Sequence, residues 1–363
     1  MDFLWYIPNQ VAPGHRLDDT TDGHNGLERL TALARLTEDH GWDGALIGTG
    51  WKRPDTFTVA TALTAATTTF DPLVAIRPGY WTPAHFASSA ATLDRLSGGR
   101  VRVNVVSGPD HQPEYGDDEG DQTQRYARTR EFMRLVRRYW TDDDVTHVGE
   151  HYRAEGASLE HKPAARAGRP HPPLYFGGAS EAAQRTSAAE ADVQLFWGEP
   201  LDGVAARIDR LRALSAEVGR DLPPLEYGLR ITTLVRDTTE EAWADAEARV
   251  AAMADGAHEW AADPGRRVAV GQQRLLDLAG RGDVLDDCLY TAPGRVGGGG
   301  AGTTWLVGSP DDVAGALRRY ADLGVTHFVL SDTPYEREIA RVGDGLLPLL
   351  RPERAVLAGG RRG

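Results

Sequence analysis

Pro173-Leu-Tyr-Phe-Gly-Gly-Ala-Ser-Glu-Ala-Ala183 is a short apolar run followed by two glycines and an alanine-rich polar stretch. This order predicts a strand that turns tightly into a helix, because Gly177 and Gly178 allow positive φ and close backbone approach. The N–H groups at a helix start, with the Ser180 hydroxyl beside them, form a seat for a phosphate group. The segment therefore predicts a βα unit that binds a phosphorylated cofactor, with an ordinary tight turn as the alternative.

Outward from this segment, strand-like and helix-like stretches alternate along the chain. Apolar runs of strand length occur at residues 3–7, 44–48, 72–77, 101–106, 173–176, 192–197, 226–235 and 327–331. Amphipathic stretches of helical length lie between them, at 27–39, 125–139, 200–218, 240–253 and 310–323. Such alternation predicts an α/β fold with a parallel sheet, and eight strands are the number of a (β/α)8 TIM barrel. A doubly wound sheet is the main alternative, but Gly48-Thr-Gly-Trp-Lys-Arg53 lacks the third glycine of the dinucleotide fingerprint.

Three connections are longer than ordinary βα loops. They cover residues 108–123, 141–172 and 255–305 and are rich in Gly, Pro and Asp. We expect one domain over residues 1–350 that carries these segments as insertions, since α/β barrels of this length form one domain. We also expect the last insertion, with Gly297–Gly300, to be mobile and to close as a lid, and residues 351–363 to form a flexible tail.

The composition limits the partners and the compartment. A formal net charge of −13 and a pI near 5.3 argue against nucleic acids and anionic membranes, because both attract basic surfaces. Cys288 is the only cysteine, which excludes an intrachain disulfide framework and favours a reducing cytoplasm. No stretch reaches the ~18 apolar residues of a membrane span. We expect no signal peptide, because the amino terminus lacks a basic region followed by an apolar one.

Other kinds of catalytic or metal site find no support. His147 and His151 are the only close pair of histidines, and their polar stretch offers no obvious third ligand, so we expect no metal site. Nucleophile-elbow, zincin and Walker motifs are absent from the sequence. We interpret the acidic run Asp117-Asp-Glu-Gly-Asp121 as a solvated loop.

Further motifs follow one another in a fixed order. They are Phe3-Leu-Trp-Tyr-Ile-Pro8, Val74-Ala-Ile-Arg-Pro78, Asp94-Arg-Leu-Ser-Gly-Gly-Arg100, Val101-Arg-Val-Asn-Val-Val-Ser-Gly108, Gln124-Arg-Tyr126, Trp197-Gly-Glu-Pro200, Tyr227-Gly-Leu-Arg230, Val268-Ala-Val-Gly-Gln-Gln-Arg274, Gly299-Gly-Ala-Gly-Thr303 and Phe328-Val-Leu-Ser331. With the first segment they make residues 1–350 resemble the luciferase-like flavin-dependent monooxygenases, most closely the FMNH2-dependent alkanesulfonate monooxygenase branch. The resemblance implies a barrel that binds reduced FMN, which reacts with O2 to a flavin (hydro)peroxide that oxygenates a small organic substrate. It also implies a transient NAD(P)H:flavin reductase partner and a homodimer or homotetramer.

The expected cofactor-binding residues at strand ends or just beyond them are Arg77, Asn104, Ser107, Gly178, Ala179, Ser180 and Trp197. Tyr126, at the start of the helix after the next loop, joins them. By the resemblance, Asn104 hydrogen-bonds the flavin ring, and Tyr126, Ala179 and Ser180 hold the phosphate. The alternatives are a satisfied polar residue inside the barrel for Asn104, a packed helix residue for Tyr126 and a plain N-cap for Ser180.

Arg230 is the strongest catalytic candidate, because it ends an apolar segment where an unpaired guanidinium is costly. The resemblance implies that it orients the reactive flavin or an anionic substrate. A salt bridge to an acidic neighbour is the alternative. Arg77 allows a similar interpretation, or it braces a barrel loop.

Five positions depart from the alkanesulfonate branch. Where that branch has two histidines, a cysteine, an arginine and a tyrosine, this chain has Gln10, Thr232, Arg53, Gly298 and Thr333, with Arg295 and Tyr335 near the last two. We predict catalytic roles for Gln10, Arg53, Thr232 and Arg295 beside Arg230. The departures predict a different substrate.

A group of aromatic residues indicates the shape of that substrate. Gly79-Tyr-Trp81 and Trp51, with Trp5 and Tyr6, are expected to form a wall on which a planar or bulky molecule stacks. The alternative is that they fill an oligomer interface or the barrel floor. If Lys52-Arg53 faces the cavity, an anionic sulfonate or carboxylate pairs with the guanidinium.

The sequence thus predicts a two-component FMN-dependent monooxygenase. Its substrate is an organosulfonate with C–S cleavage or, in preference, a bulkier or aromatic compound. A deazaflavin-dependent oxidoreductase on the same barrel and a catalytically silent flavin-binding relative are the alternatives.

Overall fold

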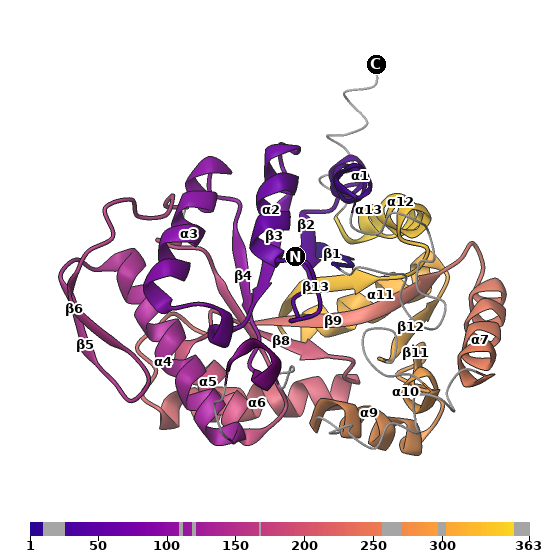
Figure 1. Ribbon diagram of the computed structural model, residues 1–363. Coiled ribbons are helices and arrows are strands. Elements are labelled where there is room, and N and C mark those ends of the chain that lie inside the picture. Colours follow the sequence, from indigo (N-terminus) through magenta and orange to yellow (C-terminus); the bar gives the residue numbers. More distant parts are fainter. Residues whose placement is uncertain are drawn as a thin grey trace. The chain divides into compact units, whose positions relative to one another are not determined.

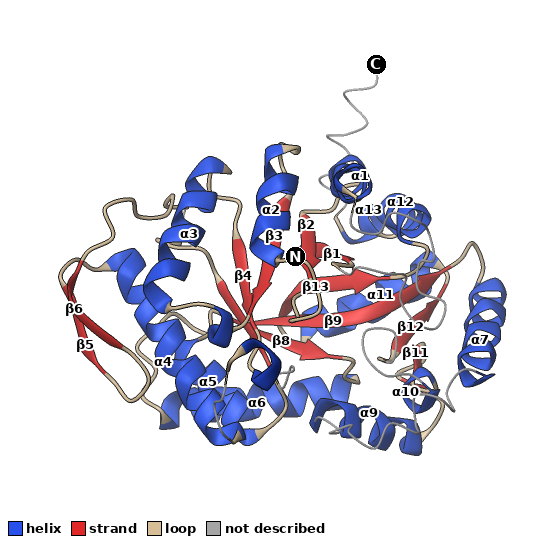
Figure 2. Ribbon diagram, in the orientation of Figure 1, coloured by secondary structure: helices blue, strands red, loops and turns tan. Residues whose placement is uncertain are grey.

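The computed structural model describes residues 1–9, 26–108, 112–117, 121–166, 168–255, 270–296 and 303–351. Within them the fold is a closed barrel of eight parallel strands that alternate with helices (Figures 1 and 2). The barrel strands are β1 (Asp2–Ile7), β2 (Gly44–Ile47), β3 (Asp71–Ile76), β4 (Arg102–Val105), β7 (Leu174–Gly177), β8 (Val193–Trp197), β9 (Glu226–Val235) and β13 (Val325–Ser331). The predicted TIM barrel is confirmed, and each predicted strand is present with bounds shifted by two residues or fewer.

Backbone contacts divide the chain into two compact units. The first unit comprises Met1–Ala45, Phe196–Ala206 and Gly228–Gly363, and the second comprises Leu46–Leu195 and Arg207–Tyr227. The prediction of one domain over residues 1–350 stays a prediction.

In the first unit, β1 runs parallel to β13, with Phe3 opposite Phe328 and their rings stacked at 5.3 Å between centroids. The second half of β9 pairs in parallel with β12 (Trp305–Gly308), which continues antiparallel into β11 (Leu289–Tyr290) and β10 (Val284–Leu285). The helices of this unit are α1 (Leu27–Asp39), α7 (Thr239–Asp255), α9 (Val270–Arg281), α10 (Pro293–Val296), α11 (Pro310–Asp322), α12 (Tyr335–Gly345) and α13 (Leu347–Leu350).

In the second unit, β3, β4, β7 and β8 lie side by side in parallel, so that Ala75, Asn104 and Tyr175 are neighbours in register. Their core is aromatic, with Phe86 packed on Phe132 at 5.5 Å between centroids. The helices are α2 (Thr56–Ala65), α3 (Pro83–Leu96), α4 (Gln122–Thr141), α5 (Glu181–Glu190) and most of α6 (Leu201–Glu217), with short 3-10 turns η1 (Pro78–Tyr80) and η2 (Gln112–Tyr115).

The predicted insertions contain regular structure that the sequence reading missed. The 141–172 segment forms an antiparallel hairpin of β5 (Val145–Val148) and β6 (Arg153–Ala157). The described part of 255–305 includes α9 and α10. Gly297–Gly300 of the predicted lid, and the predicted tail from Pro352 onward, lie outside the described residues, and closure of the 255–305 segment stays a prediction.

In the acidic run at 117–121, Asp117 is not solvated as we expected. Asp117 is buried and forms a two-pronged ion pair with Arg128 of α4, at 2.8 and 2.6 Å. Asp121 accepts the Gln124 N–H at 2.9 Å and caps the start of α4. These two carboxylates fix the chain on either side of residues 118–120, which lie outside the described residues.

Candidate functional site

The turn between β7 and α5 has the form of an anion seat. Gly178 takes φ +148°, and a Cβ there would lie 2.5 Å from the Cβ of Ala183, so a larger residue would displace the helix. The Ser180 hydroxyl caps α5 by accepting the Ala183 N–H at 3.3 Å. The cap leaves the first N–H groups of α5, apart from that of Ala183, at a helix start, where N–H groups can bind an anion.

Two polar side chains flank this turn. The Tyr126 hydroxyl of α4 lies 3.6 Å from the Cβ position of Gly178, and the Tyr126 ring packs edge-on against Phe176. Arg207 of α6 is buried and donates to the Gly178 carbonyl at 2.6 Å. Hydroxyl and guanidinium groups are both phosphate ligands. We call Tyr126, Gly178, Ala179, Ser180 and Arg207 the cradle.

Sequence reasoning found four of the five cradle residues and missed Arg207, because only the folded chain brings α6 to this turn. For Ser180 and Tyr126, the structure also contains the contacts that the alternative interpretations predict. Ser180 is an N-cap, and Tyr126 packs on Phe176. The Tyr126 contact uses its ring and the Ser180 contact uses one lone pair of its hydroxyl, so both residues can also hydrogen-bond a phosphate.

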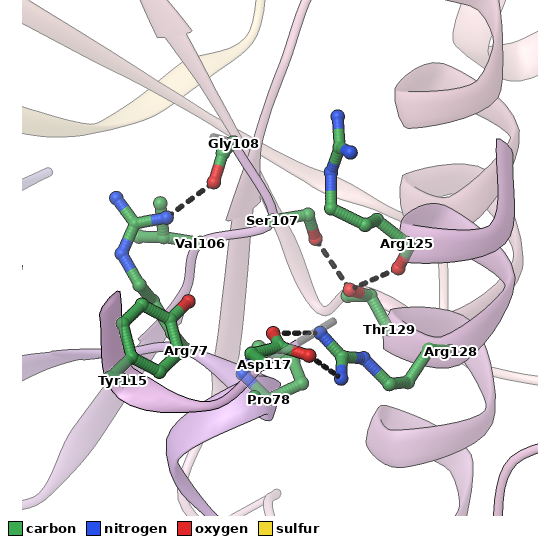
Figure 3. Close-up of a pocket in the computed structure, with 11 residues that line it drawn as sticks. Arg77, Pro78, Val106, Ser107, Gly108, Tyr115, Asp117, Arg125, Arg128 and Thr129 are labelled. Atoms are coloured by element: carbon green, nitrogen blue, oxygen red, sulfur yellow. Dashed lines mark hydrogen bonds and ion pairs between the residues drawn. The ribbon is translucent and has the colours of Figure 1, made fainter. Parts of the chain in front are cut away.

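Arg77 and Ser107, predicted to bind the cofactor, line a narrow pocket with an open volume of about 10 Å³ (Figure 3). Arg77, just after β3, donates to the Gly108 carbonyl, and the Ser107 hydroxyl donates to Thr129 at 2.6 Å. This narrow pocket is smaller than a flavin ring needs. The two contacts brace the ends of β3 and β4, and the predicted cofactor roles of Arg77 and Ser107 stay predictions. Asn104 lies half-buried in β4, two residues before Val106 of the pocket lining.

A second pocket of the same unit shares Tyr115 and Gly79 with the first and has a volume of about 420 Å³. We call it the aromatic pocket; its walls include Trp51, Arg53, Tyr80, Trp81, His85 and Tyr115. The structure thus brings together the predicted aromatic residues 51, 80 and 81 with the predicted cation at Arg53. The prediction that Trp5 belongs to this wall is wrong. Trp5 is fully buried in the core, where its ring lies 4.8 Å from that of Trp42 between centroids.

Arg230 lies in the middle of β9, which continues five residues beyond it to Val235. Its guanidinium carbon stands 4.8 Å from the centroid of the Tyr6 ring. Within the part of the chain that the structure describes, no carboxylate forms an ion pair with Arg230, so the salt-bridge alternative finds no support there. On the same strand, the buried Thr232 hydroxyl lies 3.5 Å from that of Ser331.

Trp197 ends β8 in the first unit, and its indole N–H is buried without a hydrogen-bond acceptor among the described residues. Gly198 follows at φ +60°, where a Cβ would lie 2.5 Å from the Thr303 hydroxyl and 2.9 Å from that of Thr304. Both threonine hydroxyls are also buried without a partner in the described chain. Buried polar groups are normally satisfied, so this trio fits a place where a ligand supplies the missing partners.

Two other predicted catalytic residues remain, Gln10 and Arg295. Gln10 lies outside the described residues. Arg295 is exposed on α10, donates to the Ala279 carbonyl and pairs with Asp283 at 2.5 Å. Both contacts are with neighbouring residues of the chain, and the catalytic role of Arg295 stays a prediction.

A network of buried charges lies just beyond β9 and β13. Arg236 contacts Asp332 at 3.4 Å and Glu338 at 3.1 Å, and Arg249 contacts Asp332 at 2.7 Å. Burial raises the pKa of Asp332 to about 6, and the nearby Glu338 carboxylate acts in the same direction. This network anchors the residues that lead to Tyr335, whose ring lies 6.3 Å from that of Tyr6.

The described residues hold no group of three or more His, Cys, Asp or Glu side chains suited to a metal ion. His147 instead pairs with Glu131 of α4 at 2.8 Å. Cys288 is buried, and burial raises the pKa of its thiol to about 12, so it is protonated at neutral pH. None of the helices in the described ranges is long and apolar enough to cross a bilayer.

Comparison with known proteins places these features in context. A family model described as luciferase-like monooxygenase matches residues 1–327. Riboflavin lyase RcaE, solved with modified FMN and riboflavin, is 21% identical with a TM-score of 0.76, covering 98% of this chain and 92% of that one. DmoA from Hyphomicrobium sulfonivorans is 20% identical with a TM-score of 0.73 and coverage of 97% and 87%. The F420-dependent tetrahydromethanopterin reductase of Methanopyrus kandleri is 17% identical with a TM-score of 0.68 and coverage of 96% and 98%.

Proposed function

Because the chain belongs to the luciferase-like monooxygenase family, we propose that it is a two-component monooxygenase that uses reduced FMN and O2 to oxygenate a small organic substrate. The observation that carries the proposal is the cradle. A glycine at φ +148°, a helix start and the Tyr126 and Arg207 side chains meet at one turn, which suits the phosphate that distinguishes FMN from riboflavin.

We assign the residues as follows. The cradle holds the phosphate, Asn104 hydrogen-bonds the flavin ring, and Trp197 offers its unsatisfied indole N–H to the cofactor. Arg77 and Ser107 hold the ends of β3 and β4 in place. When bound, reduced FMN supplies the two electrons with which one oxygen atom of O2 enters the substrate and the other leaves as water.

The remaining predicted residues act on the substrate side. Arg230 orients the reacting oxygen or an anionic group of the substrate, with Thr232 nearby on the same strand. Arg53, from the aromatic pocket, contacts the substrate. Gln10 and Arg295 stay candidates for the same task.

The reduced flavin comes from a separate NAD(P)H:flavin reductase that interacts transiently with this protein. We also propose a cytoplasmic homodimer or homotetramer with no nucleic acid or membrane partner. The departures from the alkanesulfonate branch favour a bulkier or aromatic substrate over a simple alkanesulfonate, and an organosulfonate with C–S cleavage is the case to be measured first.

The test is an aerobic assay with a flavin reductase, NADH and FMN, in which alkyl and aryl sulfonates are offered and released sulfite is measured. Sulfite above the enzyme-free control supports both the FMN and the desulfonation proposals. If other aromatic compounds are converted and no sulfite is released, the monooxygenase proposal stands and the substrate is not a sulfonate. Arg230→Ala should abolish product formation while FMN still binds, and full activity in that variant would contradict the role of Arg230.

An F420-dependent oxidoreductase is the second candidate, because an F420-dependent reductase and an F420-dependent alcohol dehydrogenase share this fold. Titration with FMN and with F420, followed by absorbance, separates the two. Binding of F420 with no affinity for FMN would overturn the proposal. Binding of FMN without turnover with O2 would favour the catalytically silent flavin-binding relative.

A further inference from the structure

The aromatic pocket of the second unit contains a trio of rings in mutual contact, two pairs edge to face and the Trp51–Tyr115 pair tilted. Tyr115 lies 4.7 Å from Tyr80 and 5.2 Å from Trp51, and Trp51 lies 6.5 Å from Tyr80, between ring centroids. Despite these contacts Trp51 is 47% exposed. A tryptophan held by its neighbours yet half open to solvent offers a preformed surface on which a planar ligand buries apolar area.

A second aromatic surface of the pocket is held by a different set of contacts. The Trp81 ring stacks on His85 at 5.3 Å with an interplanar angle of 19°. Phe57 and Phe86, both buried, pack against Trp81 at 5.6 and 5.9 Å. Because the core fixes Trp81, this wall does not need to rearrange when a ligand enters.

The pocket has one side-chain cation and one carboxylate in its lining. Arg53 lies over Gly50, where a Cβ would come within 3.3 Å of the Arg53 Cδ. Asp55 uses its carboxylate to cap α2, accepting the Thr58 N–H at 2.8 Å and the Thr58 hydroxyl at 2.7 Å. Asp55 therefore serves as the cap of α2, and Arg53 is the side chain of the lining whose guanidinium can donate to an anionic group of a ligand.

We propose that the aromatic pocket binds a planar arene that carries a carboxylate or sulfonate group, with the ring on the Trp51 and Tyr115 side and the anionic group at Arg53. The volume of about 420 Å³ lies within the ~300–1,000 Å³ of small-molecule sites. As a statement about the substrate, the inference rests on the proposed monooxygenase function. As a statement about binding, it can be tested without flavin.

The test measures binding of naphthoate to the flavin-free protein by tryptophan fluorescence and calorimetry, with naphthamide and decanoate as comparison ligands. We expect naphthoate to bind more tightly than either, because only naphthoate has both the rings and the charge. Trp51→Leu should weaken naphthoate binding about tenfold through loss of stacking. Because Trp51 is half exposed, this variant should fold, which circular dichroism checks.

Arg53→Met should weaken naphthoate about tenfold and leave naphthamide unchanged, since only the acid pairs with a guanidinium. Lys52→Met is the matched control: Lys52 is the adjacent cation, but it is exposed, pairs with Glu114 at 3.6 Å and does not line the pocket. Equal effects of the two substitutions would overturn the assignment of Arg53 in favour of general charge. Absence of saturable naphthoate binding, or binding unchanged in Trp51→Leu, would overturn the pocket assignment. Failure of FMN to bind would overturn the proposed function alone.

Discussion

The guanidinium of Arg230 lies over the ring of Tyr6, with 4.8 Å between the guanidinium carbon and the ring centroid. Tyr6 is in turn tilted against the buried Tyr335, which follows the turn after β13. Arg230 is thus held by an aromatic face, in place of a carboxylate. A cation–π contact orients the guanidinium without neutralising it, so the charge stays available to a bound anion or a developing negative charge.

This relationship makes Tyr6 a positioning residue for Arg230. In Tyr6→Leu we expect kcat for oxygenation to fall roughly 2- to 30-fold, the range of a cation–π contact of ~0.5–2 kcal/mol. Tyr6→Phe keeps the ring face and should restore most of kcat. FMN affinity should stay the same in both variants, and equal kcat values in the Leu and Phe variants would contradict the positioning role.

Ser180→Ala separates the helix cap from the phosphate site. Loss of the cap should destabilise the protein by about 1 kcal/mol, and loss of the cradle hydroxyl should weaken FMN binding without changing riboflavin binding. Ser309→Ala is the matched control, because Ser309 caps α11 with a bond of the same 3.3 Å length. It should cost similar stability and leave FMN affinity unchanged; an equal effect on FMN would show that the loss is indirect.

Gly79 tests the wall between the two pockets of the second unit. A Cβ at Gly79 would lie 2.2 Å from the Asp117 carboxylate oxygen that pairs with Arg128. Gly79→Ala should therefore cost about 1–3 kcal/mol of unfolding free energy and weaken naphthoate binding through displacement of η2 and Tyr115. Gly108→Ala is the control. Gly108 lines the same narrow pocket, but a Cβ there would meet no atom within 4 Å, so urea denaturation should give an unfolding free energy near that of wild type.

Asp332 predicts a specific pH dependence of stability. Its folded pKa of about 6 lies above the ordinary value of 3.8, so between these values the folded protein keeps a proton that the unfolded chain releases. Its contribution to stability is therefore complete below the ordinary pKa and is lost as pH rises through the folded pKa. From pH ~4 to pH ~7, wild type should lose up to about 3 kcal/mol relative to Asp332→Asn.

Urea denaturation of both proteins across this pH range measures the difference, and a difference that is independent of pH would contradict the prediction. Asp312→Asn provides a control of opposite sign. Hydrogen bonds from Thr239 and Ser309 lower the pKa of Asp312, so its contribution is present above the ordinary pKa and is lost as pH falls.

The strands were predictable because each is a short apolar run bounded by polar or glycine residues, a signal that depends only on local sequence. The cradle was predictable for a similar reason, since Gly178 and Ser180 follow β7 directly. Arg207 was not, because its contact with Gly178 joins residues 29 positions apart. Local patterns report burial and turns, whereas the partner of a charged side chain depends on the folded chain.

The same limit explains the errors. The sequence predicts that Asp117 belongs to an acidic, solvated run. In the structure Arg128 of the next helix donates two hydrogen bonds to Asp117 and so stabilises its buried carboxylate. Trp5 reads as a wall residue because it stands near the end of the first strand, yet it points at Trp42 in the core. Strand alternation predicts two faces but does not say which aromatic residue takes the interior one.

The single cysteine has a practical consequence. Cys288 is buried, and its thiol, with a pKa raised to about 12, is inert toward alkylating reagents at neutral pH. The wild-type chain therefore does not react with thiol reagents at neutral pH. A cysteine placed at an exposed position such as Lys52 or Leu276 would take a spin label or a fluorophore alone, without prior removal of native thiols. Distance measurements between such labels could then follow the two compact units in solution.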